Sequence, residues 1–181
     1  MAEGAAIMAN VDYTITLVSG IYETLVNRSG GMIMQKNLEL LGPIGYTEVE
    51  TAFGKAIQKA TEKPEVGMDG NVHPLKETEA IPGGGSTDVG DVSWNVPNIN
   101  LGVTVAPKDT PWHSWAVVAC GGMSIGHKGM VHAAKALGMT AVDLFENPKL
   151  INEVQEEFKT RKGDEVYKPM IEGPPPLGGV R

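Results

Sequence analysis

The sequence contains one cysteine, Cys120, among its 181 residues. A single thiol excludes an intramolecular disulfide framework, and its position in the apolar run WAVVAC favours a buried thiol in a reducing compartment. No apolar stretch approaches the length that crosses a bilayer, and the N-terminus lacks the basic start and long apolar core of a signal peptide. We therefore predict a cytoplasmic protein without a membrane partner.

Basic residues are also few. The chain has 15 lysines and arginines against 22 aspartates and glutamates, which gives a formal net charge of -7 and a pI near 5.1. A nucleic-acid backbone or an anionic membrane would repel such a chain, so neither is expected as a partner. The length of 181 residues suits one domain with a sizeable core.

The motifs of a self-sufficient metal site are missing as well. Catalytic zinc usually takes several protein ligands and a water, but the sequence has no H-x-H, no H-E-x-x-H and no cysteine pair. His113 stands between Trp112 and Trp115, just after a turn-forming segment, where α/β proteins collect functional groups. By itself it indicates either a metal ligand or base, or a structural histidine.

Hydrophobic periodicity and capping signals predict helices over much of the chain. Asn27 or Ser29 is expected to cap a helix that ends at Gly42. Thr47 and Glu50 have the spacing of a capping box at the start of the next helix. Further helices are predicted near the N-terminus and in the last third of the chain: residues 1–10, 124–137, 140–146 and 148–162.

The helices after residue 123 carry two histidines. Ser124 is expected to cap a helix that stops at Gly138, with a short helix opening at Thr140. His132 shares a polar face with lysines and is expected to be solvated. His127 lies on the apolar side, which predicts a buried, hydrogen-bonded residue, with orientation of a metal site as the alternative.

Three segments have the patterns of strands. Apolar residues alternate with polar ones over residues 11–17 and again over residues 98–106, the period of a half-buried strand. The run at residues 115–120 is apolar throughout, which favours a buried strand and leaves a buried helical turn as the alternative. The predicted fold class is therefore α/β, with helices packed on a mixed sheet.

Residues 63–85 show no periodicity and end in IPGGGS, which predicts a long loop of the kind that is often functional. Directly after it, Ser86 is placed to cap a short helical turn on which Asp88 and Asp91 share a face. These carboxylates either complement the positive end of that turn, or Asp88 reaches a metal site. A phosphate cradle lacks its lysine, and a triad of Ser86, His113 and Asp88 lacks the nucleophile elbow.

A resemblance to a known family rests on three motifs in order: GSTDVGDVSW, TPWHSW and SIGHKGMVHAAKAL. The series is similar to the C-terminal portion of aminobenzoyl-glutamate hydrolases, which are amidohydrolases of the dinuclear metallopeptidase and aminoacylase superfamily. The segments AEGAAIM and YETLVN resemble the region where such chains leave a dimerisation domain and return to the catalytic domain.

The resemblance implies two segments. Residues 1–24 would be the end of an inserted dimerisation or lid domain, and residues 25–181 the C-terminal half of a zinc-peptidase-like catalytic domain. In the family, the N-terminal half supplies most metal ligands, the bridging carboxylate and the glutamate that acts as general base. The chain alone is therefore expected to bind metal weakly and to have no turnover.

The resemblance also implies roles for individual residues. His113 matches a late histidine ligand of one metal ion. Asp88 and its neighbours Ser86 and Thr87 match a segment that lines the active site, although Thr87 stands where the family has an acidic residue. Asn27 matches an asparagine near the substrate cleft, and helix capping explains it equally well.

The implied function is metal-dependent hydrolysis of the amide bond in N-acyl amino acids, small peptides or aminobenzoyl-glutamate-like substrates. Two divalent ions, zinc or manganese, would serve the complete enzyme, which is expected to be a homo-oligomer or a heteromer with a related subunit. The alternative is a non-catalytic binding or regulatory subunit that pairs with a separate metal-bearing subunit. A domain in which His113 is only structural is a third interpretation.

Overall fold

The computed structural model describes residues 1–76 and 86–171. Within these ranges the regular structure consists of seven helices. Part of the predicted long loop (77–85) and the last residues of the chain (172–181) lie outside the described residues. None of the described helices is long and apolar enough to cross a membrane. The helices are α1 (Ala2–Ala9), α2 (Arg28–Leu41), α3 (Glu48–Ala60), α4 (Val89–Ser93), α5 (Trp115–Gly121), α6 (Ser124–Glu146) and α7 (Pro148–Lys162).

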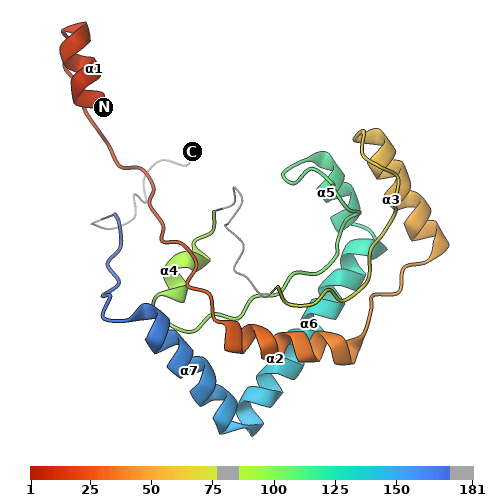
Figure 1. Cartoon of the computed structure of the whole chain (residues 1–181). Coiled ribbons are helices and arrows are strands. Elements are labelled where there is room, and N and C mark those ends of the chain that lie inside the picture. Colours follow the sequence, from red (N-terminus) through yellow and green to blue (C-terminus); the bar gives the residue numbers. More distant parts are fainter. Residues whose placement is uncertain (77–85, 172–181) are drawn as a thin grey trace.

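Helix α2 lies at the centre of the arrangement, where it packs against α6 and α7, while α1 stands apart at the end of a long extended segment (Figure 1). The predicted Asn27 cap is confirmed, because its side chain accepts a hydrogen bond from the Gly30 amide. Ile33 and Met34 are buried on one face of α2. The polar residue on that face, Asn37, is also buried.

Helices α3 and α5 form a second small core. Ile57 of α3 packs with Ala116 and Cys120 of α5, and Phe53 covers the cluster. The capping box predicted for α3 is confirmed, since the Thr47 side chain accepts from the Glu50 amide and the Glu50 carboxylate accepts from the Thr47 amide. Cys120 is buried, as predicted, and burial raises the pKa of its thiol.

Helix α6 is longer than the sequence predicts. It runs from Ser124 to Glu146 without stopping at Gly138, so the prediction of two helices is wrong. The buried Asn37 amide of α2 donates to Thr140 at 3.1 Å and to Asp143 at 2.8 Å. These contacts stabilise the helix beyond Gly138. A glycine within a helix costs only about 1 kcal/mol of stability relative to alanine, so they can outweigh it.

The predicted mixed sheet is also wrong for the described residues, which are helical or irregular and contain no strand. A strand exists only when its backbone pairs with a neighbour. No backbone–backbone hydrogen bond joins residues 12–17 or 98–105 to another described segment. The segments that carry the alternating patterns are therefore extended but unpaired. Figure 1 shows these segments as irregular coil.

Residues 115–120 form a helix, so the alternative interpretation of this run holds instead of the strand. Ser114 provides the cap by accepting from the Ala116 amide at 3.3 Å. Ala116 and Cys120, four residues apart, are buried, whereas Trp115 and Val118 are exposed. One apolar side of a helix is thus covered, and the all-apolar composition of the run hid the helical period.

Candidate functional site

The His113 loop, residues 107–114, connects an irregular segment to α5. It begins with a tight turn in which the Thr110 amide donates to the Pro107 carbonyl at 3.2 Å, and the Thr110 hydroxyl donates to the same oxygen at 2.6 Å. Asp109 adopts a left-handed backbone conformation with φ of 62°. This conformation costs a non-glycine residue roughly 1–2 kcal/mol, so the surrounding contacts must hold the turn in place.

His113 also has a left-handed backbone, with φ of 61°. The next residue, Ser114, caps α5 and donates its hydroxyl to the Pro111 carbonyl at 2.5 Å. The His113 side chain is exposed, and no hydrogen bond joins its ring to another group in the described ranges. The imidazole is therefore exposed and free of hydrogen bonds in the described ranges, on a left-handed backbone, and a buried structural role does not fit it.

The buried side-chain amide of Gln58 holds the His113 loop in place. Gln58 of α3 is fully buried, and its side chain donates to the Lys108 carbonyl at 3.1 Å and accepts from the Gly67 amide at 2.8 Å. One side chain thus ties α3 to two loops that are distant in sequence. The sequence prediction missed Gln58, although its spacing of four residues from the buried Gly54 is a signal of close approach on that face.

A cavity of about 820 Å³ lies beside the His113 loop. Glu62 and Asp109, both left-handed, line it together with Trp112, the residue before His113. Three of the four left-handed non-glycine residues in the described chain therefore lie at or next to this cavity. Backbone strain of this kind often accompanies functional sites, which makes the cavity a candidate for ligand entry.

The residues around the start of α4 do not join this arrangement. Ser86, Thr87 and Asp88 are exposed, and Asp88 at the N-cap position makes no side-chain capping bond. The Thr87 hydroxyl accepts from the Val89 amide at 3.3 Å, a local turn contact. Figure 1 shows α4 well separated from α5, so the structure does not bring Asp88 next to His113.

The side chains of α4 have a structural role. Ser93 is fully buried, accepts from the Leu25 amide at 2.8 Å and donates to the Gly90 carbonyl at 2.5 Å. Asp91 accepts from the Tyr22 amide at 3.4 Å. The helix therefore anchors the segment at residues 22–25, and Asp91 serves that contact.

Asn27 is occupied as a structural residue. Its side chain is buried, with the oxygen accepting from Gly30 and the nitrogen donating to the Val154 carbonyl, both at 2.8 Å. The amide therefore links α2 to α7. Its role at a substrate cleft remains a prediction.

His127 is exposed, so the prediction that it is a buried, hydrogen-bonded residue is wrong. It lines a shallow hollow on α6 together with Lys128 and His132. In the described chain no hydrogen bond joins the His127 ring to a neighbour. Its assignment to the lining of an active site remains a prediction.

The electrostatic centre of the α3 and α6 contact is Glu50. Its carboxylate accepts from Lys128 and from the Ser124 hydroxyl, both at 2.6 Å, in addition to its bond with Thr47. The Lys128 contact first, and then Ser124 and Thr47, lower the pKa of Glu50 to about 2. Burial and the neighbouring Glu50 carboxylate raise the pKa of Tyr46 to about 12. This network holds two helices together and leaves no free acid or base.

The donor set for a metal is incomplete in the described chain. No group of three or more histidine, cysteine, aspartate or glutamate side chains is placed to hold an ion among residues 1–76 and 86–171. His113 offers one free imidazole, the donor type that zinc and manganese sites use. One ligand therefore fits a divalent ion, and the remaining ligands would have to come from elsewhere.

Comparison with known proteins relates this chain to two hydrolases. The chain is 31% identical to a subunit of the p-aminobenzoyl-glutamate hydrolase of Escherichia coli over 183 aligned positions, covering 88% of this chain and 38% of that protein. It is 35% identical to Xaa-Arg dipeptidase of Mus musculus over 81 positions, covering 45% of this chain and 19% of that protein. No family model and no solved structure matches.

The names of the matched proteins are those of a p-aminobenzoyl-glutamate hydrolase subunit and of a dipeptidase. The similarity to both proteins supports an amidohydrolase-like family member, in agreement with the resemblance carried by the three sequence motifs. It spans less than two fifths of the length of the bacterial relative.

Proposed function

We propose that this chain forms part of a metal-dependent amidohydrolase in which His113 contributes one ligand to a pair of divalent ions, zinc or manganese. The substrate would be an N-acyl amino acid, a small peptide or an aminobenzoyl-glutamate-like amide. The observation that supports this most is the exposed, unengaged imidazole of His113 on a left-handed backbone. The similarity to a p-aminobenzoyl-glutamate hydrolase subunit supports a hydrolytic role for the protein to which this imidazole belongs.

The contribution of this chain is to present the ligand. Gln58 and the turn at residues 107–110 fix the backbone before His113, and Ser114 fixes the backbone after it. A ligand held in this way loses little conformational freedom when it binds an ion. Two divalent ions, when bound, would polarise the amide carbonyl toward attack by water.

The remaining ligands and the general base would come from residues outside these 181. The described chain lacks a group of three metal-binding side chains, and the relative is much longer than the matched region. We therefore expect the purified chain to bind zinc weakly and to hydrolyse p-aminobenzoyl-glutamate at no measurable rate. Zinc titration and a hydrolysis assay test this, and two tightly bound ions with turnover would contradict the proposal.

The matched variants for the zinc titration are His113→Ala and His73→Ala. Removal of His113 should abolish most of the weak binding, whereas His73, whose ring pairs with Asp69 at 2.8 Å, should be dispensable. Equal loss in both variants would indicate adventitious binding to surface histidines. It would remove the basis for assigning the metal to His113.

A second candidate function is a non-catalytic subunit that pairs with a separate metal-bearing subunit. The name of the bacterial relative, a hydrolase subunit, favours it, as does the incomplete donor set of the described chain. The nucleotide sequence directly upstream of the Met1 codon distinguishes the two candidates. An in-frame extension with an H-x-D-like or H-x-C-like ligand motif would contradict the separate-subunit function and support the first candidate.

A further inference from the structure

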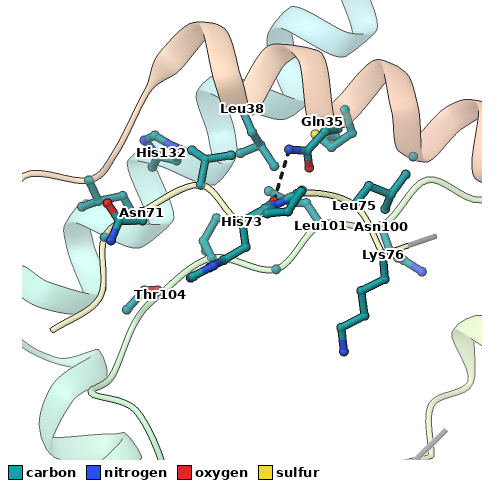
Figure 2. Close-up of a pocket in the computed structure, with 18 of the residues that line it drawn as sticks. Gln35, Leu38, Asn71, His73, Leu75, Lys76, Asn100, Leu101, Thr104 and His132 are labelled. Carbon is teal, nitrogen blue, oxygen red and sulfur yellow. Dashed lines mark hydrogen bonds between the residues drawn. The ribbon is translucent and has the colours of Figure 1, made fainter. Parts of the chain in front are cut away.

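A second cavity, of about 570 Å³, lies between α2 and two irregular segments, residues 70–76 and 100–104 (Figure 2). Its volume suits a small molecule. The His113 loop does not line it. Figure 2 shows Gln35 of α2 pointing to the backbone of His73, where the amide donates to the His73 carbonyl at 3.2 Å. This contact fixes one wall of the cavity against α2.

The charge of the lining is opposite to that of the whole chain. None of the residues that line this cavity in the described ranges is acidic, although the chain carries a net charge of -7. Arg28 and Lys76 both line the cavity, and the Arg28 guanidinium donates to the Lys76 carbonyl at 2.5 Å. Neither cation forms an ion pair with another described residue.

The histidine in the same wall has a different role. His73 pairs with Asp69 at 2.8 Å, outside the cavity lining, so a carboxylate already accounts for its ring. A second histidine, His132 of α6, also lines the cavity. With the histidines counted as neutral, the positive charge of the lining is that of Arg28 and Lys76. A carboxylate group is the natural complement, because a guanidinium binds it in a bidentate geometry.

The rest of the lining is largely apolar. Met34 and Leu38 of α2 face Leu75 and Leu101 of the irregular segments across the space. Apolar walls of this kind cover the body of a ligand, while a few polar groups fix its orientation. The required ligand is thus amphipathic, with an apolar body and one negative end.

We propose that this cavity binds a small organic carboxylate with an aromatic or branched aliphatic body, its carboxylate held by Arg28 and Lys76. The site goes beyond the proposed hydrolase function, because it needs no metal ion and does not include His113. Val103 and Thr104 line both this cavity and the one beside the His113 loop, so the two cavities share one segment of their lining.

The test uses the 181-residue chain without added metal, with benzoate as the probe and benzyl alcohol as its uncharged counterpart. Amide chemical shifts in a ¹H–¹⁵N NMR titration should change around Gly31, Leu75 and Leu101 with benzoate. Benzyl alcohol should bind at least about fivefold more weakly, because it lacks the charge that two cations recognise. The double variant R28Q/K76Q should bind benzoate about tenfold more weakly.

The matched control is Lys36→Gln, which removes an exposed α2 cation outside the cavity lining and should leave benzoate affinity unchanged. If the double variant loses helical circular dichroism, Lys76→Gln alone replaces it, with an expected loss of about threefold. Equal binding of the two probes, shifts confined to other surfaces, or no benzoate binding at millimolar concentration would each overturn the proposal. Failure of the metal titration at His113 would leave this result unaffected.

Discussion

Helices α4 and α5 are both short, and the sequence assigns residues near the start of each to one site, but the structure builds the two starts differently. Before α5, a turn, a left-handed His113 and the Ser114 cap are all fixed by hydrogen bonds. Before α4, Asp88 is exposed and makes no capping bond. The comparison shows that two segments assigned to one site by the sequence can differ in backbone constraint, and only the segment before α5 combines a constrained backbone with an exposed side chain free of hydrogen bonds in the described ranges.

The α4 and α5 regions also differ in which segment their buried polar residue contacts. Gln58 ties α3 to the loop that carries His113, whereas Ser93 ties α4 to the segment at residues 22–25. We therefore expect damage to the Gln58 network to reach His113. Damage to the α4 region should reduce stability without affecting the candidate metal ligand.

The largest expected effect comes from Gly90→Ala. A Cβ atom at Gly90 would overlap the backbone carbonyl of Tyr22, which cannot move aside as a flexible side chain would. We expect a loss of about 3 kcal/mol in the free energy of unfolding, measured by urea denaturation. Gly138→Ala is the control, because nothing lies near its Cβ position in α6 and alanine should stabilise the helix slightly.

The Gly90→Ala variant also tests whether the α4 region contributes to zinc binding. Under conditions where it remains folded, its weak zinc affinity should equal that of the unmodified chain. A selective loss of zinc affinity would show that the α4 region contributes to the metal site. Asp88 would then regain a role beside His113.

Gln58→Leu should have the next largest effect. Leucine fills a similar volume but leaves the Gly67 amide and the Lys108 carbonyl without their partner, a loss of about 2 kcal/mol. Zinc affinity should fall as well, because the loop before His113 loses its anchor. Gln155→Leu on the exposed side of α7 is the matched control. Unchanged zinc affinity in a destabilised Gln58→Leu protein would separate this network from His113.

The contact between α3 and α6 predicts a pH dependence. The pKa of Glu50 is lowered from 4.5 to about 2 in the folded chain, so the ionised form stabilises the fold above pH 4.5. This contribution should be lost as the pH falls from about 4.5 to about 2. In Glu50→Gln, the urea concentration at the midpoint of unfolding should fall less steeply than in the unmodified chain as the pH decreases over that range.

Glu157 titrates in the same range and therefore sets the background. Burial raises its pKa, but hydrogen bonds from Ser29, Arg28 and Arg161 outweigh burial and lower the pKa to about 2. Some pH dependence should therefore persist in Glu50→Gln. An unchanged slope in that variant would show that the Lys128 contact does not stabilise the fold.

The smallest expected effect is that of Ser114→Ala. It removes the cap of α5 and should cost about 1 kcal/mol by urea denaturation. Ser19→Ala, in an exposed irregular segment, should cost nothing measurable. Ser114 follows His113 directly in the chain. If Ser114→Ala and Ser19→Ala have the same free energy of unfolding, the Ser114 cap does not constrain the His113 backbone.

Local signals in the sequence were sufficient for most helices. Caps such as Asn27 and the Thr47 capping box depend on residues within one turn, so they survive in any tertiary context. Signals that depend on distant partners failed. The alternation over residues 98–106 needed a neighbouring strand, and the end predicted at Gly138 was overridden by Asn37 from another helix.

The same distinction applies to the candidate site. His113 could be identified because family motifs surround it, but its left-handed backbone depends on the turn and on Gln58, which lies 50 residues from Lys108. In α3 the apolar side chain of Val49 is exposed, whereas the polar side chain of Gln58 is buried. Burial of a polar side chain is decided by partners across the fold, and no local pattern reports them.

The most direct test of the central claim follows the ring nitrogens of the four histidines by long-range ¹H–¹⁵N NMR while zinc is added. A free, preorganised imidazole at position 113 predicts that the His113 nitrogens shift first, at lower zinc concentration than those of the other three. Earlier or equal shifts at His73, His127 or His132, with His113 unmoved, would contradict the assignment of His113 as a metal ligand.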